Sequence, residues 1–256
     1  MTPEFGDAVI LLVVGLASGF INTLAGGGSL LTLPVLIFLG LPGPVANGTN
    51  RISLLIQSVG ALVGFGQHKV LPLRAAVLAA IPYIVGTVIG AMLAVQISDR
   101  QFKPILAATI VGVMIVILLD PSRRVRAPEG ALSFRRKAAL SFGFFLVGIY
   151  GGFIQAGAGF VIITLMLMAG FDLIQTNAVK IMVVLFSTCI ALAIFIAHGQ
   201  VNYIYGLVLG IGSAIGAWAA TFVAVKKGHA WIRGFVLLMV IIFAAKLTYD
   251  SFGSPF

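Results

Sequence analysis

Residues 19–51 read GFINTLAGGGSLLTLPVLIFLGLPGPVANGTNR, an apolar stretch that contains three consecutive glycines, Gly26, Gly27 and Gly28. Each glycine inside a helix costs about 1 kcal/mol relative to alanine, so three in a row predict that a helix breaks here. Broken backbone is tolerated in hydrocarbon where it is buried in protein or lines a watered cavity. Because polar residues flank the break, we interpret it as a binding site. The alternative is a crossing point at which small residues let two helices pack closely.

The candidate substrate-binding residues lie at this break and at a second glycine-rich break later in the chain. Those of the first half are Asn22, Thr23, Gly26, Gly27, Gly28, Ser29, Asn47, Asn50 and Arg51. Those of the second half are Gln155, Gly157, Gly159, Thr176, Asn177 and Lys180. Amides and hydroxyls can donate hydrogen bonds to an oxyanion, and the rest can cap or join helices. Short helices that start near Ser29 and Phe160 would add N–H groups and a positive dipole end.

The composition is that of a membrane protein. The chain has 256 residues, of which 60% are hydrophobic and 9% are charged, with a net charge of +9. This balance predicts an all-α, polytopic integral membrane protein whose surroundings are the lipid bilayer. In a soluble protein the positive charge would suggest nucleic acid, but here the cations fall in loops and indicate topology instead. We therefore expect no nucleic acid partner, and a homodimer is an open alternative.

Ten apolar elements follow one another along the chain. We expect them at 7–25, 29–39, 45–67, 72–95, 102–119, 138–155, 160–169, 173–197, 203–225 and 231–247. The second and seventh are too short for the roughly 20 residues that a crossing helix needs. Each of these two follows a glycine-rich break, so the sequence predicts a broken helical hairpin in each half.

The same order of long and short elements occurs twice. An offset of 130 residues aligns Asn47 with Asn177, Asn50 with Lys180 and His68 with His198. We therefore predict one membrane transport domain over 1–256, with repeat 1 at 1–119, a linker at 120–137 and repeat 2 at 138–256.

The positive charges predict that the two repeats are inverted. The linker carries Arg123, Arg124, Arg126, Arg135, Arg136 and Lys137, which places it in the cytoplasm. With an odd number of crossings per repeat, the further cations Lys69, Arg74, Lys226, Lys227 and Arg233 are also cytoplasmic. The acidic N-terminus is then outside. Parallel repeats would reverse both assignments, so we expect inverted repeats with both termini outside the cytoplasm.

Two cations, Arg51 and Lys180, lie inside apolar elements, where a charge costs at least ~2.5–3.5 kcal/mol and usually has a partner. Asp172 is the one acid near either of them, so we expect both cations to face an anionic ligand. The alternative is that both side chains reach to the lipid headgroups. His68 and His198 could gate by pH, although an interfacial position is the favoured interpretation.

An enzyme is not expected. The sequence has no Gly-x-Ser-x-Gly, no His-Glu-x-x-His and no paired carboxylates inside the apolar elements. Three scattered histidines and one cysteine predict no metal site, and we expect no cofactor. The cysteine, Cys189, is expected to be a small buried side chain.

The breaks resemble those of the sulfite exporter TauE/SafE family, also called the toluene sulfonate uptake permease family. The residues that carry the resemblance are the ranges 19–29 with Pro34, 46–49, 148–152, 157–159 and 199–202. The resemblance implies a bacterial inner-membrane carrier, often an exporter, of sulfur-containing anions such as sulfite or the organosulfonate sulfoacetate. An anion channel with the same site, and a membrane scaffold or assembly factor that transports nothing, are the alternatives.

Overall fold

The computed structural model describes residues 3–66, 73–119 and 133–226, and within these ranges every regular element is an α-helix. The helices are α1 (Phe5–Ala25), α2 (Ser29–Phe38), α3 (Gly43–Gly66), α4 (Leu73–Ala94), α5 (Asp99–Leu119), α6 (Phe134–Phe153), α7 (Ala158–Met168), α8 (Leu173–Ala197) and α9 (Tyr203–Lys226). Their order and type confirm the predicted all-α fold, and their bounds lie within four residues of the expected ones.

Four of the described helices are long and apolar enough to cross a membrane. These segments are Phe5–Ala25, Ala76–Ala94, Gln175–Ala197 and Tyr203–Phe222. Their outward faces are apolar, as Val13 of α1 and Leu78 of α4 illustrate with exposed fractions of 63% and 67%. Such faces are stable when lipid replaces water around them. The chain is therefore a multi-pass membrane protein.

The helices pack through glycine faces. Gly15 and Gly19 of α1 lie against α9, and a Cβ atom on Gly19 would lie 1.9 Å from the carbonyl oxygen of Ser213. In the same way, Gly86 and Gly90 of α4 lie against the backbone of α6. Small residues let the two backbones of each pair approach closely, which is how helices associate in lipid. The first helix of each half therefore packs against the fourth helix of the other half.

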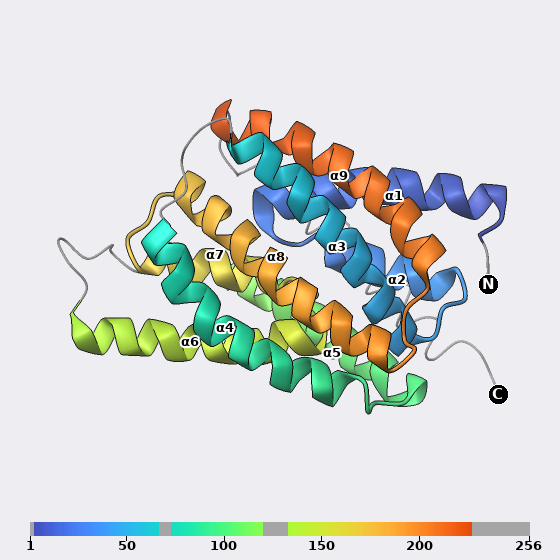
Figure 1. Ribbon diagram of the computed structural model, residues 1–256, viewed down its shortest axis with the longest axis horizontal. Coiled ribbons are helices and arrows are strands. Elements are labelled where there is room, and N and C mark those ends of the chain that lie inside the picture. Colours follow the sequence, from blue (N-terminus) through green and yellow to red (C-terminus); the bar gives the residue numbers. More distant parts are fainter. Residues whose placement is uncertain (1–2, 67–72, 120–132, 227–256) are drawn as a thin grey trace.

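The two broken hairpins enter the molecule from opposite ends. In Figure 1, the connection between α2 and α3 lies at the right, whereas the connection between α7 and α8 lies at the left. Inverted repeats would produce this arrangement. The repeat relation itself and its inversion across the membrane stay predictions.

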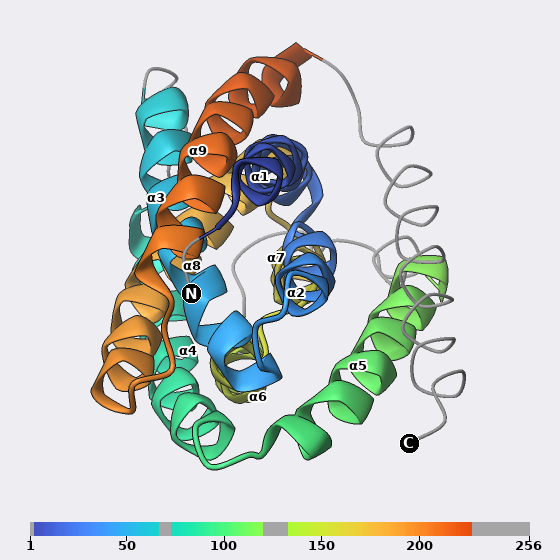
Figure 2. The ribbon, with the colours of Figure 1, turned by 90° about the vertical axis from the view of Figure 1, so that its right-hand side faces the viewer.

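The short helices α2 and α7 occupy the middle of the bundle when it is viewed along its long axis (Figure 2). Helix α5 covers them from one side, where Phe102, Leu106 and Ile110 pack against Leu24 and Leu33 in one buried cluster. In the same view α1 lies above them, α6 lies below them, and α3, α4, α8 and α9 lie on the side opposite α5. The polar residues that interrupt the hairpins, such as Asn22, Ser29 and Gln155, are buried in the protein.

Several predictions from the sequence fall outside the described residues. These are the tenth element at 231–247, His68, Lys69, the linker residues Arg123, Arg124 and Arg126, and Lys227, Arg233 and the C-terminus. One prediction that falls inside them is wrong: Cys189 is exposed on the surface of α8 rather than buried. An apolar run on both sides of a residue does not fix which face of the helix points outward.

Candidate functional site

Each broken hairpin turns through residues with left-handed backbone. Helix α1 ends at Ala25 and is capped by Gly26, whose φ angle is 85° and whose N–H donates to the carbonyl oxygen of Asn22. At the second break, Gln155 and Gly157 have φ angles of 56° and 72°. Glycine adopts this conformation at little cost, whereas a glutamine there is strained. The predicted breaks are present, and the second one holds the side chain of Gln155 in an uncommon backbone geometry.

The two breaks touch each other at the centre of the molecule. A Cβ atom on Gly159 would lie 2.4 Å from the Cα atom of Gly26, a distance that real Cβ atoms do not show. Glycine is required here because the two backbones meet directly. The alternative of a small-residue crossing point therefore describes the contact between Gly26 and Gly159. It does not describe the polar side chains around them.

Lys180 of α8 is buried, with 2% of its surface exposed. Its Nζ atom donates to the carbonyl oxygens of Asn22 at 2.7 Å and Thr23 at 2.9 Å, and to Oδ1 of Asn177 at 2.9 Å. Asn22 and Thr23 belong to the last turn of α1, whose carbonyls form the negative end of the helix dipole. The ammonium group therefore sits on the end of the broken helix of the other half.

Arg51 of α3 has the reciprocal position in the second half. Its guanidinium donates to the carbonyl oxygen of Gly152 at 2.8 Å and to Oε1 of Gln155. Gly152 lies in the last turn of α6, so this cation also stabilises the negative end of a broken helix. The guanidinium also lies over the ring of Phe195, 5.5 Å from its centroid, as a cation–π contact.

Neither cation reaches the lipid headgroups, so the alternative that they do so is wrong. Arg51 is 1% exposed, and both side chains end inside the protein. No described carboxylate pairs with either of them, and the ion pair recorded in the described part of the chain joins Lys103 and Asp99. The partners of the two cations in the structure are neutral carbonyls and amides, which the sequence did not predict, and the expected anionic ligand stays a prediction.

The asparagines tie α3 to both hairpins. Asn50 donates through Nδ2 to Ser29 Oγ at 3.2 Å and accepts from Thr32 Oγ1 at 2.7 Å. Asn47 donates to the carbonyl oxygen of Phe153 at 2.8 Å. Asn22 accepts from the N–H of Gly28 at 3.3 Å. These amides are therefore engaged in holding the broken backbone, which in the membrane interior needs internal partners.

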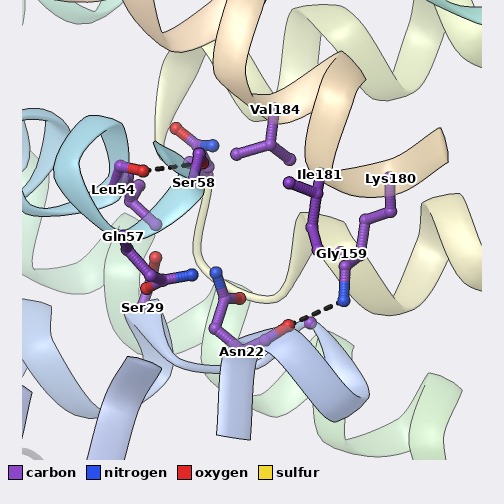
Figure 3. A pocket seen from close by; sticks show the side chains of 11 residues that line it. Asn22, Ser29, Leu54, Gln57, Ser58, Gly159, Lys180, Ile181 and Val184 are labelled. Atoms are coloured by element: carbon purple, nitrogen blue, oxygen red, sulfur yellow. Dashed lines mark hydrogen bonds between the residues drawn. The ribbon is translucent and has the colours of Figure 1, made fainter. Parts of the chain in front are cut away.

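A small polar cavity lies where the breaks, α3 and α8 meet (Figure 3). Its volume is about 10 Å³, roughly the room that one water molecule needs. The residues that line it are Asn22, Gly26, Ser29, Leu54, Gln57, Ser58, Gln155, Gly159, Lys180, Ile181 and Val184. The structure thus brings together side chains from both halves around one enclosed point.

The candidate residues divide into two groups at this cavity. Six of them line it: Asn22, Gly26, Ser29, Gln155, Gly159 and Lys180. The other nine lie around it without lining it: Thr23, Gly27, Gly28, Asn47, Asn50, Arg51, Gly157, Thr176 and Asn177. Of these nine, Arg51 contacts Gln155 and Asn177 contacts Lys180, and both of these partners line the cavity.

Gln57 and Ser58 of α3 line the cavity although sequence reasoning did not select them. Gln57 is buried, and its Oε1 atom has no hydrogen-bond partner among the described atoms. A buried amide oxygen without a partner costs roughly 1–3 kcal/mol, so it marks a place where a water or ligand donor fits. The sequence signal that could have identified Gln57 is its position in the middle of an apolar helix. A polar side chain is rare there in a membrane protein unless it serves a functional site.

Comparisons with known proteins give a consistent result. The family model described as "Sulfite exporter TauE/SafE" matches residues 11–247. A "Probable membrane transporter protein" of Haemophilus influenzae is 29% identical over 246 residues, which cover 94% of each chain. The "Probable membrane transporter protein YfcA" of Escherichia coli K12 is 29% identical over 95% of this chain and 90% of its own. YunE of Bacillus subtilis, with the same description, is 22% identical over 96% and 99%.

Proposed function

The chain belongs to the sulfite exporter TauE/SafE family, and we propose that it exports small sulfur-containing anions such as sulfite or the organosulfonate sulfoacetate. That it is a multi-pass transporter of the inner membrane follows from the family and from the apolar helices. The substrate class and the direction of transport are our proposal.

The observation that carries this proposal is the position of Lys180. Lys180 lines the central cavity together with Asn22, Gln155 and Ser29, whose side chains carry amide and hydroxyl groups. One fixed cation surrounded by amide and hydroxyl donors suits an oxyanion, because hydrogen bonds to a charged group are roughly twice as strong as neutral ones. No described carboxylate pairs with Lys180, so its charge is not neutralised by a described acid and can attract an anionic ligand.

We infer different roles for the two cations from their contacts. Lys180 can turn from the carbonyls of Asn22 and Thr23 to an anion in the cavity, which is a stronger partner than a neutral carbonyl. Arg51 does not line the cavity and holds Gln155, which does. We therefore assign Lys180 as a direct ligand of the anion and Arg51 as a positioning residue.

The cavity has a volume of about 10 Å³, which is too small for a sulfite ion. Binding therefore needs a conformation in which the breaks separate. The contact between Gly26 and Gly159 joins one break to the other, so motion of one half against the other would open the site there. Broken-helix transporters expose such central sites alternately to the two sides of the membrane.

Counterflow in proteoliposomes tests this proposal. Vesicles loaded with unlabelled sulfite or sulfoacetate should take up the labelled anion transiently above equilibrium, and the rate should saturate. A channel would give anion conductance without counterflow, and a scaffold would give neither. Either result for all candidate anions would refute the proposed carrier function.

A further inference from the structure

A second and larger cavity lies between α4, α6 and α7, near the residue at which α6 begins. Its volume is about 140 Å³, comparable with the roughly 150 Å³ of an apolar cavity that holds benzene. The residues that line it are Leu78, Ala79, Lys137, Leu140, Ser141, Phe144, Met166, Ala169 and Phe171. All of these except Lys137 and Ser141 present carbon or sulfur atoms. The cavity therefore has the size and the chemistry for part of a hydrocarbon chain.

A cluster of positive charges stands beside this cavity. Lys137 lines it, and Arg135 and Arg136 precede Lys137 in the first turn of α6. All three side chains are exposed, and the described part of the chain records no ion pair for any of them. The N-terminal end of α6 adds a partial positive charge at the same place. An anionic group would therefore be attracted there.

The surface around the cavity faces lipid. Leu78 and Ile81 of α4 are 67% and 60% exposed, and Phe142 of α6 is 61% exposed. In Figure 1, α4 and α6 run side by side along one face of the bundle, with α7 behind them. An apolar interior, cations next to it and a lipid-facing surround match the two ends of one class of molecule, an anionic phospholipid.

We propose that this cavity binds an acyl chain of an anionic phospholipid whose phosphate is held by Lys137, with Arg135 and Arg136 at the level of the headgroup. The bound lipid would join α4, from the first half of the chain, to α6 and α7, from the second half. It would therefore stabilise the contact between the halves, a role separate from the anion site at Lys180.

The test is native mass spectrometry of the full-length protein, delipidated in a neutral detergent and titrated with phosphatidylglycerol. Phosphatidylcholine with the same chains supplies the zwitterionic comparison, and glycerol 3-phosphate supplies the headgroup alone. We expect phosphatidylglycerol to bind most tightly. Lys137→Gln should weaken its binding about fivefold, as expected for one lysine at an anionic headgroup, and Lys137→Arg should restore it.

Two further variants complete the test, one that fills the cavity and one that serves as a control. Ser141 is exposed, so Ser141→Trp should fold normally, and its ring should fill the cavity and remove the phosphatidylglycerol site. Lys103→Gln removes one exposed lysine from α5 and should leave binding unchanged. The proposal is overturned if phosphatidylcholine binds equally well, if glycerol 3-phosphate competes as strongly as the lipid, or if Lys137→Gln and Ser141→Trp bind like wild type.

Discussion

Replacing Lys180 with glutamine should weaken binding of the transported anion by between about tenfold and about a hundredfold. The ammonium group lies within 2.7–2.9 Å of three neutral oxygens and lines the cavity. A hydrogen bond to a charged group contributes roughly 1.5–3 kcal/mol, and each 1.4 kcal/mol is a factor of ten in affinity. Glutamine keeps a donor for the carbonyls of α1, so the variant should fold with a stability loss of about 1–3 kcal/mol.

The assay is equilibrium binding of sulfite, sulfoacetate and taurine to the purified variant, after gel filtration shows that it is folded. Lys103→Gln is the matched control, because it removes an exposed lysine of α5 that lies outside the cavity lining. It should bind as wild type does. If Lys180→Gln binds every anion that wild type binds with unchanged affinity, Lys180 only stabilises the end of α1 and the proposed site is wrong.

Three further predictions concern the contact between the breaks, the role of Arg51 and the topology. Gly159→Ala should lower the free energy of unfolding by about 1–3 kcal/mol, because its Cβ atom would clash with the backbone of Gly26. Gly112→Ala is the control, because a Cβ atom there would meet nothing within 4 Å. Equal melting temperatures for the two variants would contradict the contact between Gly26 and Gly159. Arg51→Lys should destabilise by a similar amount and weaken anion binding, since lysine lacks the fork that reaches Gly152 and Gln155; a fully stable, fully active variant would refute this role. A reporter fused after Phe256 that is active only in the cytoplasm should stay dark, and a signal would rule out inverted repeats.

Sequence reasoning found the breaks because their cause is local. Glycine in a helix costs free energy wherever the helix packs, so Gly26, Gly27 and Gly28 indicate a break without any knowledge of neighbours. The buried cations were found for a similar reason, since Arg51 and Lys180 stand out in apolar sequence. A charge in hydrocarbon needs a partner whatever the fold.

The partners of these cations could not be found in this way. Lys180 binds the backbone carbonyls of Asn22 and Thr23, and every residue carries such a carbonyl, so no side chain marks the pairing. The pairing crosses between the halves and depends on how they pack. Gln57 was missed because its position at the cavity depends on the rotation of α3, which its packing against α8 and α9 determines.

The start of α6 shows another limit of predicting helix bounds from apolar residues alone. The sequence predicted the sixth element from residue 138, yet the helix begins at Phe134, capped by Ser133, which accepts from the N–H of Arg136 at 3.4 Å. Charged residues can continue a helix into water, where hydrophobicity gives no signal but a capping serine does. Because the helix begins at residue 134 rather than 138, Arg135, Arg136 and Lys137 belong to α6 and lie next to the second cavity.

The most direct test of the account is net sulfite efflux from proteoliposomes under a potassium diffusion potential at equal pH. The inside-negative potential supplies about 2.3 kcal/mol per charge per 100 mV in the outward direction, and the described residues that line the cavity include no carboxylate or histidine to carry a proton. We predict that efflux rises with the potential in wild type and falls at least tenfold in Lys180→Gln at low sulfite. Efflux that ignores the potential, follows an imposed pH gradient and disappears in His68→Ala or His198→Ala would show coupling to protons and contradict the account.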